Sequence, residues 1–317
     1  MRLHALALIF KEIRTAEEVD RHSQEMLSSI PKNTAAEMAY PDVLHPSSLL
    51  SNFNVRDDTK TFAAFRNDQC VGLASFIWSQ APFLPPSFLN RIFFILSLKE
   101  AKNIADRLIE KVESYYLQLQ VPEISYIRLA PVNRLSPSGR RLGKHGYRKR
   151  FWLRRMARRL DNIPNADTAS APTLRRVAWA KQDLLLFMTT WAKGFGWPAK
   201  YIQPAAEGMT EKFLERHQDD PNTWINFLVE QNGQPVGTAA FLTFPETAYA
   251  VNVSTLAAFR RKGIATCAMI QLMESCKTQG MKYMTLDTDE TAALNLYRKL
   301  GFKEYGESAG YVKHFNQ

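Results

Sequence analysis

The sequence has few of the residues that mark cross-linked, metal-binding or membrane-spanning proteins. Three cysteines among 317 residues cannot all pair, and two of them, Cys267 and Cys276, fall on one predicted helix. This excludes a disulfide framework and favours a reducing compartment. The six histidines show no metal-ligand spacing to a cysteine or to one another, so no metal site is predicted. The longest apolar runs, such as 92–96, are far shorter than the ~18–20 residues that span a bilayer.

The apolar run at 5–10 is too short for a convincing signal peptide. We therefore expect a cytoplasmic protein with no membrane span. A protein delivered into another cell by a specialised secretion system would have the same composition, so that alternative stays open.

The length and an internal repeat indicate two related domains. Single cores seldom grow beyond ~250–300 residues, and residues 161–172 are rich in Pro, Asn, Asp, Ala and Ser, as linkers are. Residues 67–76 match 232–241 at six of ten positions. A second match, of 144–147 with 299–302, keeps the order, which is typical of a duplication. We predict domains at 1–160 and 173–317, joined by a linker at 161–172.

Hydrophobic periodicity predicts a mixed α/β fold for the second domain. Asn232-Gly233 supplies the positive-φ residues of a hairpin turn, and Gly280 stands at a helix C-terminus. The predicted strands are 174–178, 224–230, 236–244, 248–256, 283–287, 302–305 and 311–315, and the predicted helices are 183–192, 205–217, 264–279 and 291–300. This order describes a mostly antiparallel mixed sheet flanked by helices.

The most informative stretch is Arg260–Ala265, between a predicted strand and a predicted helix. A glycine-containing loop that opens a helix leaves backbone N–H groups pointing outward, which together with the helix dipole form an anion site. About thirty residues downstream the sequence reads Ala293-Leu-Asn-Leu-Tyr-Arg-Lys-Leu-Gly-Phe302. Strand, R-x-x-G-x-[GA], helix, strand and A-x-x-L-Y-x-K-x-G-F together resemble the GCN5-related N-acetyltransferase (GNAT) superfamily. The match is good over 222–315 and topological over 173–220.

The resemblance implies a fold of two tandem GNAT-like domains and an acetyl-CoA site in the second one. The backbone amides of 261–266 would hold the pyrophosphate, and the end of the strand at 253–255 would pair with the pantetheine arm and support the thioester oxygen. Tyr297 would protonate the departing thiolate, although its helical spacing also fits an ordinary core position. The implied cofactor-binding residues are Val253, Thr255, Arg260, Arg261, Lys262, Gly263, Ile264, Ala265 and Thr266.

The implied reaction is direct attack by a primary amine of a small molecule or of a protein or peptide, with no covalent enzyme intermediate. Phe195, Trp197 and Tyr249 are the candidate substrate-binding residues on the acceptor side, and an apolar loop packed on the other domain is the alternative for the first two. Glu290 stands where many relatives carry Asn. Tyr249 stands where some relatives carry a basic carboxylate; Glu246, Asp287, Asp289 or a water chain are open substitutes.

The first domain resembles the same fold without its chemistry. The residues after the predicted strand 91–96 run into a helix with no glycine, and Leu142 aligns with Tyr297. We expect a degenerate GNAT-like domain that is structural or helps to form the acceptor site, and an active site unlike that of the second domain stays an open alternative.

The net charge of +10 equals the ten Lys and Arg residues of 140–159, which contain no Asp or Glu, so the rest of the chain sums to zero. Three interpretations stay open: a solvated face, docking of an acidic or nucleic-acid partner, and a contribution to CoA binding. Docking by this segment belongs to the competing hypothesis, a non-catalytic interaction protein built on a CoA-binding scaffold.

Overall fold

The computed structural model describes residues 8–28, 59–77, 91–96, 101–129, 138–165, 172–217, 222–244 and 246–315. These residues form two compact units. The first unit takes the described residues up to Leu153 together with those from Gly306 onward, and the second unit takes Arg154–Tyr305.

The second unit is a mixed sheet in the strand order β6-β11-β10-β9-β8-β7. Only the β10–β11 pair is parallel among these neighbours, and its ladder joins Thr247–Tyr249 to Tyr283–Thr285 before the two strands part. The elements, in chain order, are the second half of β6 (Arg148–Arg159), β7 (Thr173–Arg176), α7 (Lys181–Gly194), α8 (Ala199–His217), β8 (Trp224–Gln231), β9 (Gln234–Thr243), β10 (Thr247–Thr255), the 3-10 turn Ala257–Phe259, α9 (Ile264–Thr278), β11 (Tyr283–Thr288), α10 (Thr291–Lys299) and the start of β12 (Lys303–His314). This matches the expected mixed α/β class.

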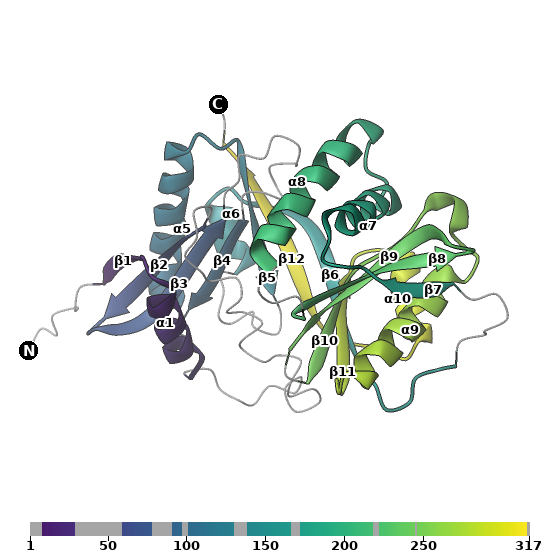
Figure 1. Cartoon of the computed structure of the whole chain (residues 1–317). Coiled ribbons are helices and arrows are strands. Elements are labelled where there is room, and N and C mark those ends of the chain that lie inside the picture. Colours follow the sequence, from purple (N-terminus) through teal and green to yellow (C-terminus); the bar gives the residue numbers. More distant parts are fainter. Residues whose placement is uncertain are drawn as a thin grey trace, which may run out of the picture. The chain divides into compact units, whose positions relative to one another are not determined.

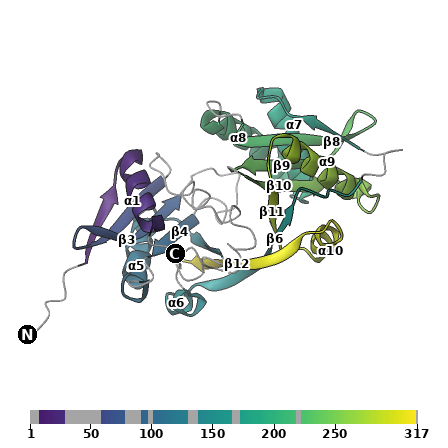
Figure 2. The same ribbon diagram turned by 90° about the horizontal axis from the view of Figure 1, so that it is seen from below.

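Helices cover both faces of this sheet (Figure 2). On one face α9 and α10 pack through Ile264, Leu272 and Tyr297 onto sheet residues such as Phe241. On the other, α7 and α8 pack against alternate sheet residues, among them Leu228. The alternation of strand side chains between the two faces explains why these strands are apolar almost throughout.

The first unit has the strand order β1-β2-β3-β4-β5-β12. Helix α1 lies on one face of its sheet and α5 on the other (Figure 1), so that Ala63 and Phe65 contact α1 while Phe62 and Ala64 belong to the core with α5. Its elements are β1 (Ile9–Ile13), α1 (Ala16–Ser28), β2 (Thr59–Arg66), β3 (Gln69–Ile77), β4 (Arg91–Leu96), α5 (Ala101–Gln118), β5 (Glu123–Leu129), the short α6 (Gly139–Lys144) and the outer parts of β6 and β12.

The compact units differ from the two expected segments because each half of the sequence gives a strand to the other unit. Residues 154–159 of β6 pair with β11 in the second unit. Residues 308–314 of β12 pair with β5 in the first unit. Residues 154–160 therefore do not group with the rest of 1–160, and 306–317 do not group with 173–305. That 1–160 and 173–317 are duplicated segments stays a prediction.

Both sequence repeats adopt the same local structure in the two units. The hairpin turns have positive φ at Asn67 and Asp68 in one copy and at Asn232 and Gly233 in the other. Each hairpin has one register shift just before its turn. The second repeat ends a helix in both units: Gly146 (φ 81°) and Gly301 (φ 83°) adopt the left-handed conformation that closes a C-terminal cap. These matches at equivalent places support a duplication.

One element differs from the prediction. The two short strands expected at 302–305 and 311–315 are a single strand, β12, and the glycines between them do not form a turn. At Gly310 a Cβ atom would collide with the ring of Phe151, so the glycine admits an aromatic neighbour. Glycine within a strand can mark such a close approach of another group instead of a break.

No helix in the described ranges is long and apolar enough to cross a membrane. The three cysteines are free thiols, with Cys70 and Cys276 buried.

Candidate functional site: a cavity at the end of β10

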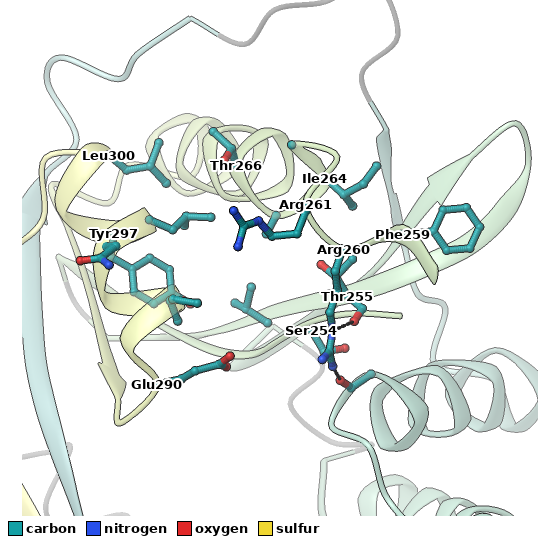
Figure 3. Close-up of a pocket in the computed structure, with 18 of the residues that line it drawn as sticks. Ser254, Thr255, Phe259, Arg260, Arg261, Ile264, Thr266, Glu290, Tyr297 and Leu300 are labelled. Atoms are coloured by element: carbon teal, nitrogen blue, oxygen red, sulfur yellow. Dashed lines mark hydrogen bonds between the residues drawn. The ribbon is translucent and has the colours of Figure 1, made fainter. Parts of the chain in front are cut away.

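A cavity of about 840 Å³ opens in the second unit where β10 ends and α9 begins (Figure 3). Its walls come from the end of β10, the loop to α9, the first turn of α9, helix α10 and the end of α7. The predicted cofactor and catalytic residues that line it are Val253, Thr255, Arg260, Arg261, Gly263, Ile264, Ala265, Thr266 and Tyr297. Lys262 is not among the described lining residues, and its ammonium lies 5.3 Å from the centre of the Phe259 ring.

The loop before α9 has the backbone geometry of an anion site. Gly263 is the N-cap residue of α9, with φ 78°, and no side chain caps the helix there. Because a helix cannot satisfy its own first N–H groups, those of the first turn remain open to an acceptor, and the helix dipole favours a negative one. Arg261 also has positive φ, 64°, and in Figure 3 its side chain extends across the cavity toward α10.

The end of β10 is bent by a bulge that turns it toward the cavity. The register with β9 shifts between Val251 and Ser254, and Asn252 has φ 53°. Thr238 holds the bulge, since its hydroxyl lies 2.7 Å from the carbonyl oxygen of Asn252 and 2.8 Å from the Ser254 hydroxyl. The described ladder between β10 and β11 ends at Tyr249. Beyond it, the edge of β10 that faced β11 can pair with another extended chain.

Tyr297 faces the cavity from α10 and is only 7% exposed. Burial raises the pKa of its phenol to about 12, and the nearby Glu290 carboxylate raises it further. The phenol is therefore protonated at neutral pH. The C-terminal cap just below it holds α10 in place: Phe302 N–H donates to the carbonyl oxygen of Tyr297 (3.0 Å), and the Phe302 ring stands edge-on to the phenol ring.

The three predicted substrate-binding residues are not brought together. Phe195, 53% exposed, lines the cavity. Trp197 packs on Trp191, with 5.2 Å between ring centres, and is not among the described lining residues. Tyr249 of β10 also lies outside that lining, in a largely buried polar cluster with Asp287 and Arg155.

The candidate basic carboxylates differ in whether they contact Tyr249. Asp287 accepts a hydrogen bond from Arg155 Nε at 3.0 Å and one from the Tyr249 hydroxyl, so it is the carboxylate next to Tyr249. Burial, reinforced by Asp287, raises the pKa of Tyr249 far above its usual range. Glu246 instead pairs with Lys282, and Asp289 is exposed. Sequence reasoning missed Arg155 because nothing in the local sequence places β6 beside β11.

About half of the ten cations of the basic segment 140–159 pair with carboxylates of the protein. Arg158 is buried and donates to backbone carbonyls of Leu300 and Asn162. The pairs that residues of the segment make with carboxylates are Arg141–Asp106, Arg150–Glu123, Arg154–Glu304, Arg155–Asp287 and Arg159–Asp161. None of its residues is among those that line the cavity. The described part of the chain contains no cluster of three or more His, Cys, Asp or Glu residues suited to a metal ion.

In the first unit, Leu142 at the position of Tyr297 is fully buried in the core. Tyr147 N–H donates to its carbonyl oxygen (3.1 Å), the same bond that Phe302 makes to Tyr297. The expected glycine-free loop before α5 includes residues 97–100, which lie outside the described residues.

The fold and the cavity define an α/β protein whose loop before α9 has the backbone geometry of an anion site, at the carboxyl end of two strands that part. Residues 190–302 match the model of the Acetyltransferase (GNAT) family. The second half of the chain therefore carries the sequence signature of the GNAT acetyltransferase family. Among curated proteins no sequence matches it.

Solved structures share the fold over nearly the whole chain. A GCN5-related N-acetyltransferase from Sphaerobacter thermophilus has 16% identity and TM-score 0.68, with 96% of this chain and 95% of that one covered. A tandem GNAT protein from the clavulanic acid biosynthesis pathway has 10% identity and TM-score 0.66, with 98% and 99% covered. A GCN5-related N-acetyltransferase from Kribbella flavida has 14% identity and TM-score 0.58, with 90% and 98% covered. At such identities the likeness is one of fold, here a tandem GNAT fold.

Proposed function

We propose that the protein is an acetyl-CoA-dependent N-acetyltransferase whose active site is the cavity of the second unit. One observation carries the proposal: the bulged end of β10, the glycine-capped start of α9 and Tyr297 all border a single cavity of about 840 Å³. The family assignment supports acetyl transfer in general, and the cavity suggests how acetyl-CoA would be held.

In this proposal the backbone N–H groups of Arg261–Thr266 hold the pyrophosphate, with Arg261 adding positive charge. The edge of Val253–Thr255 pairs with the pantetheine arm as a further strand would. A backbone N–H there stabilises the negative charge that develops on the thioester oxygen. A neutral primary amine of a small molecule or of a protein or peptide attacks the thioester carbonyl directly. The C–N bond forms, the C–S bond breaks as CoA leaves as its thiolate, and the proton lost by the nitrogen passes to solvent. The first unit takes no part in the chemistry, since Leu142 replaces the phenol.

Tyr297 acts toward the leaving sulfur. A free thiol has a pKa of ~8.5, whereas burial raises the pKa of the Tyr297 phenol to about 12. Complete proton transfer to the thiolate is therefore uphill, and a hydrogen bond donated to the developing thiolate is the larger part of the role. Such a donor is effective in a site shielded from water.

The test is a thiol-release assay with acetyl-CoA over small amines, aminoglycoside-like compounds, and peptides with free N-termini or lysines. An enzyme releases CoA thiol only when an acceptor is supplied, whereas an interaction protein on a CoA-binding scaffold binds acetyl-CoA without turnover.

With an acceptor in hand, Tyr297→Phe should lower kcat roughly 100-fold or more and leave the Kd for acetyl-CoA nearly unchanged. Tyr311→Phe, which removes a phenol hydroxyl from the first unit, is the control and should keep wild-type turnover. Unchanged turnover in Tyr297→Phe would remove the role assigned to this residue.

A further inference from the structure

The side chain of Arg260 is engaged within the protein. Its Nε donates to the carbonyl oxygen of Thr255 at 3.1 Å, and its Nη2 donates to the carbonyl oxygen of Gly194 at 2.7 Å (Figure 3). Thr255 is the last residue of β10 and Gly194 the last residue of α7. The loop Arg260–Gly263 and the first turn of α9 are called the phosphate loop below. The Arg260 guanidinium thus links this loop to the end of α7, 66 positions earlier in the chain.

The end of α7 also lies directly against β10. A Cβ atom at Gly194 would collide with the side chain of Ser254, so only glycine permits this approach. The last carbonyls of a helix have no partner within it, and a cation placed there satisfies one of them and complements the helix dipole. Arg260 and Gly194 together fix where α7 stops.

The residues that follow Gly194 are tied to this point. The N–H groups of Phe195, Gly196 and Trp197 donate to carbonyls of the last turns of α7, at 3.0, 3.0 and 3.1 Å. The Trp191 ring contacts Phe195 and Trp197, with ring centres 5.5 and 5.2 Å away. Displacement of Gly194 would carry the exposed Phe195 away from the cavity wall.

We propose that Arg260 is a positioning residue, not a phosphate ligand, and that it holds the segment Gly194–Trp197 against the phosphate loop. Pyrophosphate binding is then coupled to the order of the Phe195 wall of the cavity, an inference that rests on the proposed function. A pyrophosphate that immobilises Arg261–Thr266 also immobilises Arg260, and Arg260 in turn orders that wall. The anchoring itself does not depend on any ligand.

The anchoring is tested by hydrogen exchange in the free protein. Arg260→Ala should speed exchange of the Phe195, Gly196 and Trp197 amides about tenfold, as expected when one charge-assisted hydrogen bond is lost. Lys262→Ala removes the same charge from the same loop and should leave these rates unchanged. Arg260→Lys keeps the charge without the fork that spans two carbonyls and should restore them only in part. Equal rates in Arg260→Ala and wild type would overturn the proposal.

The coupling is tested with CoA and with pantetheine, which lacks the pyrophosphate. CoA, but not pantetheine, should change the tryptophan emission of the wild type, and Trp197→Phe should reduce that change. Arg260→Ala should bind CoA within about threefold of wild-type affinity but lose most of the change in emission. Arg261→Ala should lose more affinity than Arg260→Ala.

If Arg260→Ala loses as much affinity as Arg261→Ala, the guanidinium contacts phosphate and the proposal is wrong. If the wild type binds no CoA, the proposed function fails, while the exchange experiment still decides whether Arg260 anchors the loop.

Discussion

Gly263 is the residue on which the geometry of the phosphate loop depends most directly. It adopts φ 78°, and a Cβ atom built on it would meet no atom within 4 Å. A side chain would therefore not clash with the rest of the protein. Its penalty would come from the left-handed backbone and from occupying the space next to the open N–H groups of α9.

Gly280 offers a matched comparison, since it has φ 84°, also has open space around its Cβ direction, and follows the other end of α9. Gly263→Val and Gly280→Val should each lower the free energy of unfolding by about 1–2 kcal/mol or more. Only Gly263→Val should weaken acetyl-CoA binding, by about tenfold or more, because hydrogen bonds to the pyrophosphate would be lost. Calorimetric titration measures the affinities, and equal affinity in the two variants would count against a pyrophosphate at this loop.

At the scale of elements, an arginine of strand β6 caps the C-terminus of α10. Arg158 of β6 is 7% exposed and donates to the carbonyl of Leu300, the C-cap residue of α10, and to that of Asn162. Burial lowers the pKa of Arg158, opposed by the charge of Asp161. Arg158 of the basic segment thus serves the helix that carries Tyr297.

Arg158→Leu should destabilise the second unit by roughly 1.5–3 kcal/mol or more, because hydrogen bonds from a charged group are lost and buried carbonyls lose their donor. The neighbouring Arg159→Leu is the control. Arg159 pairs with Asp161 on the surface, where ion pairs contribute about 0–1 kcal/mol. Urea unfolding followed by tryptophan fluorescence measures both. If the two variants lose the same stability, Arg158 is not the cap that its contacts indicate.

At the scale of the whole molecule, the exchange of strands makes the two units depend on both halves of the chain. Seven residue pairs join β12 to β5 in the first unit, and six join β6 to β11 in the second. Lys313 of β12 also makes a 2.8 Å ion pair with Glu113 of α5, largely shielded from solvent. A half expressed alone would leave an open sheet edge, which favours aggregation.

We therefore expect fragments 1–160 and 173–317 to be unstable separately and to form a one-to-one complex when produced together. A cooperative unfolding transition in the mixture, absent from each fragment, would be the positive result, measured by circular dichroism and sedimentation. Cleaving the intact protein at a protease site inserted in the linker controls for the chain break and should leave the complex assembled. Two fragments that each fold cooperatively alone would contradict a required exchange.

The sequence by itself determined most of the local elements of the second half and the family signature found there. One hairpin turn and three helix ends need a residue with positive φ. The sequence has glycine or asparagine at each of them, because these residues tolerate that conformation: Asn232-Gly233, Gly263, Gly280 and Gly301. The repeats and the motif around Tyr297 gave the fold class for the same local reason.

Only the tertiary structure decided which strands are neighbours. Strand pairing joins residues far apart in sequence, and the side-chain pattern of β6 or β12 does not identify its partner. For that reason the buried pair of Arg155 with Asp287, the Arg158 cap on α10 and the link from Arg260 to Gly194 could not be read from the sequence. Each depends on a contact that exists only after the sheet and its covering helices have assembled.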